Sequence, residues 1–311
     1  MCRGILLLAL GLGLAAHAER GGASPEKQPV TVAAVQLSGY DKVGNIAPDL
    51  DPVAAMLPYI ERAGREEVDL LVFPEYHLGR IRIPGPETKR IGAAVREQAL
   101  YVVAGSWELL EGGKYANAAL LFGRDGELAG RYYKTHAAVD KWNENKVPYT
   151  APPPRRSLDW FVNEDPEWIM KKGEELPVFE LDFGRVGILT CYDGWFPEPW
   201  RILSLKGAEL IVWINGRHGG IEDFLVKSAM FRNEVHVMAT NQAYGGGTMI
   251  GQYPFKILER MGNPGEGYIR ATLDMARLRN ARAHSRNLAQ RRPDLYGILA
   301  EPLDRARYLG K

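Results

Sequence analysis

Three residues that could carry chemistry each end a run of strand-forming residues. Glu75 ends VDLLVFPE, Lys134 ends ELAGRYYK and Cys191 ends RVGILTC. In open α/β sheets, active sites gather at strand ends, so one place in the fold could hold all three. Taken singly, each has a plainer explanation: a solvated carboxylate, a surface lysine of a hairpin and a small buried hydrophobe.

Together, the three side chains could cleave an acyl compound through a covalent intermediate. A cysteine attacks as its thiolate, so it needs a nearby base and positive potential. Glu75 could take the thiol proton and later activate a water molecule. Lys134 could stabilise a tetrahedral oxyanion, helped by the backbone N–H of Tyr192. Thiol reactivity would distinguish this role from a structural one: an activated Cys191 should alkylate quickly near neutral pH at a rate that tracks a lowered pKa, whereas a buried inert cysteine would react only after denaturation.

Signatures of other enzyme classes are missing from the sequence. It contains no G-x-S-x-G elbow, P-loop, H-E-x-x-H or C-x-x-C motif. The six histidines show no spacing typical of metal ligands. The GGG run at 245–247 lacks the dinucleotide-binding pattern, so we interpret it as a tight turn. We therefore predict neither a metal nor a nucleotide cofactor.

The composition is that of an ordinary globular protein. The chain has 311 residues, of which 46% are hydrophobic and 25% are charged. Its 39 basic and 38 acidic side chains nearly cancel, which argues against nucleic acid as a partner.

The first 18 residues are predicted to be a secretory signal peptide. Arg3 precedes a 13-residue apolar run, and Ala16-His17-Ala18 fits a small-x-small cleavage site. The run is shorter than the roughly 20 residues that span a bilayer, although an uncleaved anchor or a buried helix remains an alternative. We expect residues 1–18 to be removed, residues 19–28 to form a polar linker, and the protein to reach the periplasm or the medium without a membrane attachment. Cys191 would then be the only cysteine, which excludes an internal disulfide.

The rest of the sequence alternates strand and helix patterns. Strands are predicted at 31–37, 68–74, 99–107, 117–123, 127–134, 178–184, 185–191, 209–214, 235–240 and 268–274. Helices are predicted after Asp51, at 86–98, around 197–206, at 221–234 and from Met275. Pro58 inside the first helix predicts a kink or a late start. Because several strands are uninterrupted apolar runs, we expect an α/β protein with sheets covered on both faces.

Two regions do not fit this alternation. Residues 136–176 hold three tryptophans and three consecutive prolines, which favours a lid or pocket wall over a plain surface insertion. The basic region after 275 could contact a polyanion, but the neutral overall balance favours a solvated helix or an arm at a dimer interface. We predict one domain from 29 to 285 and a C-terminal arm from 286 to 311.

Three motifs resemble the nitrilase superfamily of carbon–nitrogen hydrolases. FPEY, GRYYKTH and VGILTCYDGWFPE occur in that order, and the similarity extends over about residues 29–285. The resemblance implies a single-domain, four-layer α-β-β-α sandwich that forms a homodimer or a higher homo-oligomer. It also implies that Glu75 is the general base, Lys134 the oxyanion-stabilising cation and Cys191 the acyl-accepting nucleophile.

Members of this superfamily often use a second glutamate to position the lysine. Glu144, ten residues after Lys134, is the first candidate. Glu164, Glu167 and Glu174 are weaker candidates.

The WINGRHGG segment at 213–220 lies where the superfamily builds a substrate wall. Asn215, Arg217 and His218 could bind a polar or anionic substrate group there. They could equally be solvated loop residues.

The Cys-Tyr-Asp-x-x-Phe-Pro-Glu block is more similar to amidases and carbamoyl hydrolases than to nitrilases, whose cysteine usually precedes Trp-Glu. We therefore predict a hydrolase of non-peptide amide bonds that forms a thioester. Its partners would be a small-molecule amide or carbamoyl substrate and water. The alternatives are an N-carbamoyl-amine hydrolase, a nitrilase, and a catalytically silent secreted binding protein of the same fold.

Overall fold

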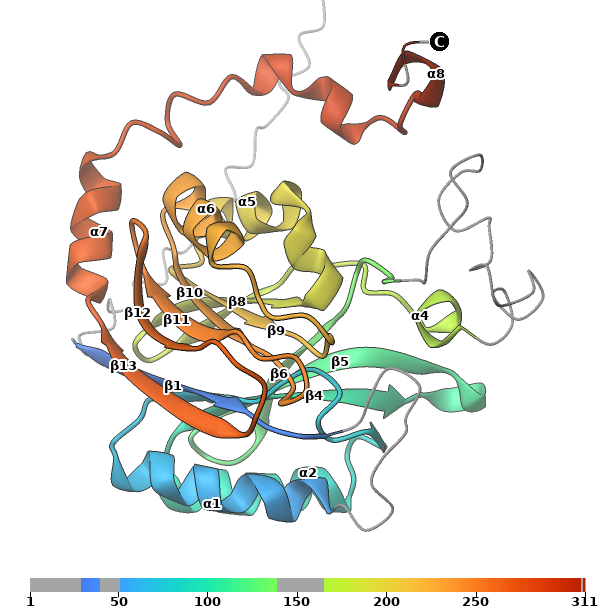
Figure 1. Ribbon diagram of the computed structural model, residues 1–311, viewed down its shortest axis with the longest axis vertical. Helices are drawn as coiled ribbons and strands as arrows, with labels where there is room; N and C mark the ends of the chain where they lie inside the picture. Colours follow the sequence, from blue (N-terminus) through green and yellow to red (C-terminus); the bar gives the residue numbers. More distant parts are fainter. Residues whose placement is uncertain (1–28, 40–50, 139–164, 309, 311) are drawn as a thin grey trace, which may run out of the picture.

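Two β-sheets pack face to face at the centre of the computed structural model, which describes residues 29–39, 51–138, 165–308 and 310 (Figure 1). The strands of the first sheet are β1 (Val30–Gln36), β2 (Leu70–Val72), β3 (Arg80–Ile81), β4 (Tyr101–Leu109), β5 (Tyr115–Phe122), β6 (Leu128–Tyr133) and β13 (Gly267–Leu273). The strands of the second sheet are β7 (Val178–Leu181), β8 (Gly184–Thr190), β9 (Leu210–Ile214), β10 (His236–Thr240), β11 (Thr248–Gln252) and β12 (Lys256–Met261). The strand orders are β13-β1-β2-β4-β5-β6, with β3 beside β4, and β12-β11-β10-β9-β8-β7.

Helices cover the outer face of each sheet. These helices are α1 (Pro52–Arg65) and α2 (Pro86–Gln98) on the first sheet, and α5 (Pro197–Leu205) and α6 (Asp223–Asn233) on the second. Figure 1 shows α1 and α2 below the sheets and α5 and α6 above them. The expected single-domain α-β-β-α sandwich is therefore confirmed.

The two-residue period of the strands explains why their sequences are apolar throughout. In β1, Val32 and Ala34 face the core between the sheets, whereas Ala33 and Val35 pack beneath α1 and α2. The central strands of the second sheet divide their side chains in the same way between the inner core and the α5–α6 layer. A strand buried on both faces needs apolar residues at every position, which is why continuous apolar runs predicted these strands correctly.

The first helix begins where the sequence predicts. The Asp51 side chain accepts a hydrogen bond from the N–H of Ala54 at 3.0 Å, and Pro52 is the first helical residue. Of the two expected alternatives, a kink or a late start, the late start is therefore excluded. Pro58 is exposed, and Ala54, whose carbonyl would have received the missing hydrogen bond, is also exposed, so water can satisfy that carbonyl.

Some elements were not predicted. β3, β11, β12 and the short helix α4 (Pro166–Ile169) have no counterpart among the expected elements. The strand β12 is the edge of its sheet and reads KILERM, a polar sequence without a clear alternation of buried positions. The turn predicted at 245–247 is present, with a positive φ at Gly246 and Gly247.

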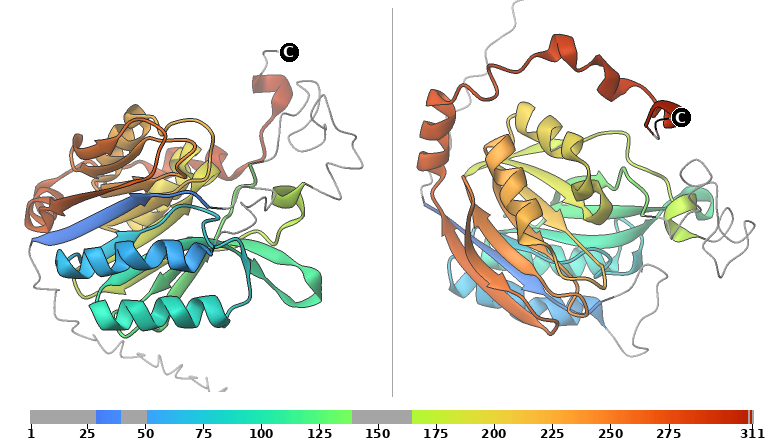
Figure 2. Two further views of the ribbon diagram at one scale, coloured as in Figure 1. Left: turned by 60° about the horizontal axis from the view of Figure 1, so that its bottom comes forward. Right: turned by 45° about the horizontal axis from the view of Figure 1, so that its top comes forward.

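The C-terminal region forms a helix followed by an arm. The helix α7 (Met275–His284) is tied to the body by Arg279, which pairs with Glu209 at 2.6 Å, and by Arg282, whose Nε donates to the Glu234 carbonyl at 2.7 Å. Figures 1 and 2 show the arm leaving α7 and arching over the α5–α6 side without joining either sheet.

Several expectations concern residues outside the described ranges. These are the signal peptide at 1–18, the linker at 19–28 and most of the expected lid at 136–176. Within the part of the chain that is described, no helix combines the length and apolar character needed to cross a bilayer.

Candidate active site

Glu75 and Lys134 meet at one end of the first sheet. Glu75 lies three residues after β2, and Lys134 follows β6 directly. Lys134 Nζ donates to Glu75 Oε1 at 3.1 Å, and Asn117 Nδ2 on β5 donates to the same oxygen at 2.7 Å. Both charged side chains are fully buried. Glu75 Oε2 has no hydrogen-bond partner among the described residues, so it is the oxygen left to accept a proton.

Glu167 completes this buried cluster. Its Oε1 accepts hydrogen bonds from Lys134 Nζ at 2.6 Å and from the Tyr76 hydroxyl. Its Oε2 accepts a hydrogen bond from the N–H of Ala138 at 2.5 Å. The Asp165 side chain begins α4 by accepting from the N–H of Glu167 at 2.9 Å, which fixes the backbone that carries this glutamate.

Closeness in sequence favours Glu144 as the partner of Lys134, whereas the described contact is with Glu167, 33 positions on. Glu144 and Glu164 lie outside the described residues, and Glu174 is exposed. Asp165-Pro166 is a typical helix start, and this signal could have drawn attention to Glu167.

The charges of the cluster shift each other's pKa. Burial and the neighbouring Glu167 raise the pKa of Glu75, and Lys134 and the hydrogen bond from Asn117 only partly oppose this. Burial also opposes the charge of Lys134, but Glu167 and Glu75 together hold the Lys134 pKa well above its usual range. Lys134 therefore stays protonated, while Glu75 is better placed to exchange a proton near neutral pH.

Cys191 reaches this region from the second sheet. It follows β8 and begins a short 3-10 helix, Cys191–Trp195. Its φ is +48°, an uncommon left-handed conformation for a residue other than glycine. Trp213 Nε1 donates to the Cys191 carbonyl at 2.8 Å and holds this peptide in place. The N–H of Tyr192 falls in the first turn, where a helical N–H has no acceptor within its own helix.

The thiol is not activated in the resting protein in the expected way. Although Cys191 is only partly buried, desolvation raises the pKa of its thiol well above the usual range, and the charges of Glu75 and Glu167 raise it further. Lys134 and Arg217 act in the opposite direction but do not offset this. The lowered pKa that an activated cysteine would show is therefore not found in the resting site, because desolvation beside two carboxylates outweighs two cations.

The raised pKa predicts how Cys191 alkylation depends on pH. Below the thiol pKa the thiolate fraction grows about tenfold per pH unit. The iodoacetamide rate of the folded protein should therefore keep rising about tenfold per pH unit beyond about pH 9, whereas the rate for the denatured protein should level off above the ordinary cysteine pKa of about 8.5. Cys191→Ala corrects for any other reactive group. A plateau at or below neutral pH in the folded protein would contradict the raised pKa.

The 213–220 segment passes close to Glu75. A Cβ on Gly216 would lie 3.3 Å from Glu75 Oε2 and 2.7 Å from the Tyr76 ring, so a side chain there would crowd the site. Asn215 is fully buried, and its Nδ2 donates to the carbonyls of Trp213 and Thr240, at 3.0 and 3.3 Å, which indicates a role in holding the loop.

Arg217 is the cation of this segment that lies near the cysteine. Its guanidinium lies 5.9 Å from the ring centre of Trp195 and 5.8 Å from that of Trp213. Nη2 donates to the Gly220 carbonyl at 2.5 Å and to the Glu222 carboxylate, whereas Nε is buried without a partner among the described residues. His218, by contrast, is exposed.

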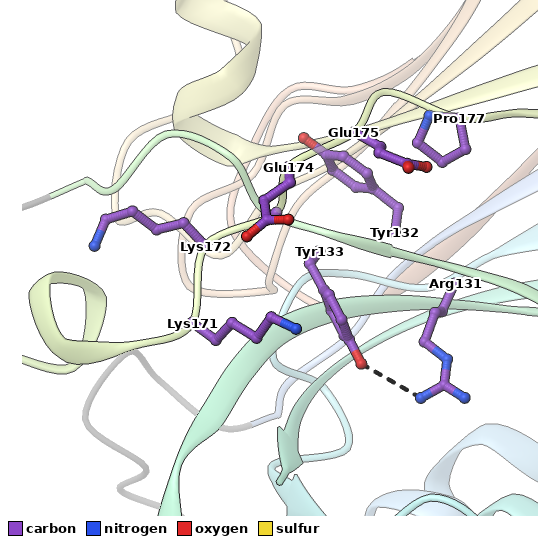
Figure 3. Close-up of a pocket in the computed structure, with 9 residues that line it drawn as sticks. Arg131, Tyr132, Tyr133, Lys171, Lys172, Glu174, Glu175 and Pro177 are labelled. Carbon is purple, nitrogen blue, oxygen red and sulfur yellow. Dashed lines mark hydrogen bonds between the residues drawn. The ribbon is translucent and has the colours of Figure 1, made fainter.

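A separate cavity of about 250 Å³ lies beside β6 and is shown in Figure 3. Its lining does not include Glu75, Lys134 or Cys191. Two polar groups of its lining, Arg131 Nη1 and the Tyr133 hydroxyl, both donate to Glu108, at 2.5 and 2.8 Å. Among the described side chains, no group of three or more His, Cys, Asp or Glu residues could hold a metal ion.

Comparisons with known proteins identify the family. A family model described as carbon–nitrogen hydrolase matches residues 31–283. Human omega-amidase NIT2 is 26% identical over 239 residues, which cover 73% of this chain and 79% of that protein. A protein of Pseudomonas protegens described as "Hydrolase in pqqF 5'region" is 27% identical over 299 residues, which cover 87% of this chain and 96% of that one.

Solved structures share the fold. Saccharomyces cerevisiae Nit3, described as a member of branch 10 of the nitrilase superfamily, has a TM-score of 0.66 at 20% identity and covers 85% of this chain and 97% of that one. A double mutant of the amidase from Nesterenkonia sp. AN1, in complex with acrylamide, has a TM-score of 0.65 at 17% identity and covers 88% of this chain and 98% of that one. The match of the family model across most of the sequence shows that the chain belongs to the carbon–nitrogen hydrolases of the nitrilase superfamily.

Proposed function

We propose that this carbon–nitrogen hydrolase cleaves a small-molecule, non-peptide amide through a thioester on Cys191. The observation that carries the proposal is the buried cluster of Glu75, Lys134 and Glu167 beside the turn that holds Cys191. It supplies a base, a permanently charged cation and a nucleophile within one site. Relatives named as amidases favour an amide over a nitrile as the substrate.

In the first half-reaction, Glu75 takes the thiol proton through its unpaired Oε2 as the sulfur attacks the substrate carbonyl carbon. The oxyanion that forms is stabilised by Lys134 Nζ and the N–H of Tyr192. The tetrahedral intermediate collapses, the carbon–nitrogen bond breaks, and Glu75 returns its proton to the departing amine. Because the resting thiol is protonated, the base is needed at the moment of attack.

In the second half-reaction, Glu75 removes a proton from water, which attacks the thioester carbonyl. The same two donors stabilise the second oxyanion. This intermediate then collapses, the carbon–sulfur bond breaks to release the carboxylic acid, and the proton held by Glu75 passes to the sulfur and regenerates the thiol. Glu167 does not react. It holds Lys134 by a 2.6 Å hydrogen bond and keeps it charged, so that Lys134 acts as an electrostatic group rather than as a base.

The test is ammonia release from matched primary amides, N-carbamoyl amines and nitriles, combined with mass spectrometry of acid-quenched enzyme. We expect turnover of amides and an acyl adduct on the peptide that contains Cys191. Carbon dioxide released together with ammonia would assign the protein to the N-carbamoyl-amine hydrolases, and turnover of nitriles alone would make it a nitrilase. Silence across the panel, with no adduct, would favour the non-catalytic binding protein.

The proposed site of action is outside the cytoplasm. The support is the apolar run and the Ala16-His17-Ala18 site in the sequence. N-terminal sequencing of exported protein should begin at Glu19. A chain that keeps residues 1–18 and stays in the cytoplasm would remove this part of the proposal.

Arg217 is proposed to bind a polar or anionic group at the far end of the substrate. Replacing Arg217 by Gln should lower kcat/KM for a primary amide that carries a distal carboxylate by about 10- to 100-fold, because a charge-assisted hydrogen bond is lost. For a primary amide of the same length that carries an uncharged methyl ketone in place of the carboxylate, kcat/KM should fall much less. The measurement is the ratio of the two kcat/KM values.

Two further variants separate charge from geometry. Arg217→Lys keeps the charge near Cys191 but loses the planar fork, so it should recover only part of the preference. Lys227→Gln, in an exposed pair with Asp223, should leave the ratio unchanged. If Arg217→Gln lowered kcat/KM equally for both substrates, Arg217 would act only through the electrostatic effect of its charge on Cys191.

The protein is proposed to work as a homodimer or a larger homo-oligomer. Large apolar side chains are 57–66% exposed along the arm, at Leu295, Ile298, Leu299 and Leu303. The outer face of α5 and α6 also exposes apolar residues: Ile202, Leu205, Phe224 and Phe231. Apolar surface of this extent is typical of an interface.

Removal of the arm after Ser285 tests this interface. Truncation there keeps α7 and its hydrogen bonds to the body. The shortened chain should elute from gel filtration as a smaller species with its thermal transition intact. Leu295→Ser combined with Leu299→Ser should weaken association in the full-length chain. An unchanged oligomer in both cases would exclude the arm from the interface.

A further inference from the structure

Asp193, two residues after Cys191, has a fully buried carboxylate. Its Oδ2 accepts a hydrogen bond from the N–H of Thr190 at 3.0 Å. Thr190 is the last residue of β8 and directly precedes Cys191. One side chain therefore closes a tight turn around the nucleophile.

The other oxygen of Asp193 holds the strand end that carries Lys134. Oδ1 accepts from the N–H of Thr135 at 3.2 Å and from the N–H of His136 at 2.8 Å. These are the two residues that follow Lys134. The carboxylate thus binds the backbone before the cysteine and the backbone after the lysine at the same time.

Side chains complete the set of donors. The Thr135 hydroxyl and His136 Nδ1 both lie 2.9 Å from Oδ1. The Tyr132 hydroxyl donates to Oδ2 at 2.7 Å. Successive residues of β6 point to opposite sides, so Tyr132 is directed away from Tyr133, whose ring faces Arg131 and Lys171 in the cavity beside β6 (Figure 3).

This connection matters because no sheet hydrogen bonds join the two strand ends. Cys191 follows a strand of the second sheet, and Lys134 follows a strand of the first. The relative position of Cys191 and Lys134 must therefore be set by contacts across the interface between the two sheets. The left-handed φ of Cys191 also has to be imposed by its surroundings, because a non-glycine residue does not favour it.

We infer that Asp193 is a positioning residue, which sets the Cys191 turn relative to Lys134 through its hydrogen bonds to residues 190, 135 and 136. The inference rests on the proposed roles of Cys191 and Lys134, and Asp193 itself does not touch the substrate. Displacement of a reacting group by about 1 Å is enough to lower a rate by about 100-fold.

The test compares three variants of this network. Asp193→Ala removes every acceptor and should lower kcat by about 100-fold or more, with KM changed by no more than about threefold. Asp193→Asn keeps one oxygen but turns an N–H₂ group toward the N–H of Thr190 or toward residues 135 and 136, so its loss should be smaller. Tyr132→Phe removes one donor and should lower kcat by no more than about tenfold.

Asp69→Asn is the matched control. Asp69 is also buried and accepts from the N–H of Thr31 at 3.0 Å and from Arg124 at 2.8 Å, but none of these residues belongs to the proposed site. It should lower the Tm without changing kcat. If Asp193 were only structural, its variants would behave like Asp69→Asn at temperatures well below their Tm, and the inference would be overturned.

Alkylation of Cys191 gives a readout that does not require a substrate. In Asp193→Ala the turn is no longer held, so the Cys191 thiol should become more exposed. The pH profile of its alkylation should move toward that of an ordinary cysteine and level off above the ordinary pKa of about 8.5. A wild-type profile in folded Asp193→Asn and Tyr132→Phe, with kcat unchanged, would also reject the inference. Failure of the wild-type protein to release ammonia would instead count against the proposed function, and the alkylation profile would still decide the role of Asp193.

Discussion

Replacement of Cys191 by alanine should abolish amide hydrolysis, with kcat/KM reduced on the order of 10⁴-fold or more. Without the sulfur no thioester can form, and the remaining groups cannot divide the reaction into two steps. The residual rate would come from Glu75 acting on water and from Lys134 stabilising an oxyanion. Steady-state ammonia release and the absence of an acyl adduct in quenched samples would measure the effect.

The fold should tolerate this substitution. Cys191 is only partly buried, and its turn is held by the backbone and by Trp213 and Asp193 rather than by the sulfur. The Tm of Cys191→Ala should therefore stay close to that of the wild type. Cys191→Ser, which retains a weaker nucleophile, should also be inactive or nearly so. Activity of Cys191→Ala within tenfold of the wild type would refute the thioester mechanism.

The sequence predicted the fold well because its strands are buried on both faces. The apolar runs that ended at Glu75 and Cys191 placed both residues at strand ends, and the structure places them there. The edge strand β12 was missed, because its sequence KILERM has no such run. The strand β11 was also missed, although it is mostly buried and lies between β10 and β12, because its five residues, TMIGQ, contain too short an apolar run.

The partners of the three reactive residues were harder to predict. Glu167 approaches Lys134 only because the chain returns to the site after 33 positions, and spacing alone favoured Glu144. The raised pKa of the Cys191 thiol was missed for a related reason. A sequence indicates which charges exist, but the balance of burial against nearby charges depends on the assembled site.

Replacement of Lys134 by methionine should impair both catalysis and stability. Loss of an oxyanion-stabilising group typically lowers kcat by about 10²- to 10³-fold. The substitution also leaves Glu75 and Glu167 buried without the cation that Lys134 Nζ places 3.1 and 2.6 Å from their oxygens. Breaking a buried ion pair in this way costs about 3–5 kcal/mol of the free energy of unfolding. Urea denaturation and ammonia release would measure the two effects.

The loss of stability in Lys134→Met should depend on pH, and the direction of this dependence follows from the two buried carboxylates, Glu75 and Glu167. Without Lys134, the pKa of Glu75 and that of Glu167 should rise in the folded state, so the folded protein binds more protons than the unfolded chain. The free energy of unfolding of Lys134→Met should then fall as the pH rises above the ordinary glutamate range. Its deficit relative to the wild type should be smaller near pH 5 than near pH 8. A deficit that does not vary with pH would contradict this account.

A double variant separates the two roles of the lysine. Lys134→Met combined with Glu167→Gln removes the cation together with one of the carboxylates that it compensates, so part of the stability should return. Activity should not return, because no positive charge is left to stabilise the oxyanion. Lys171→Met, at an exposed lysine that lines the cavity beside β6, should change neither activity nor stability. Recovery of activity in the double variant would mean that Lys134 serves only to balance the buried charges, and the stabilisation of the oxyanion would then have to come from backbone N–H groups such as that of Tyr192.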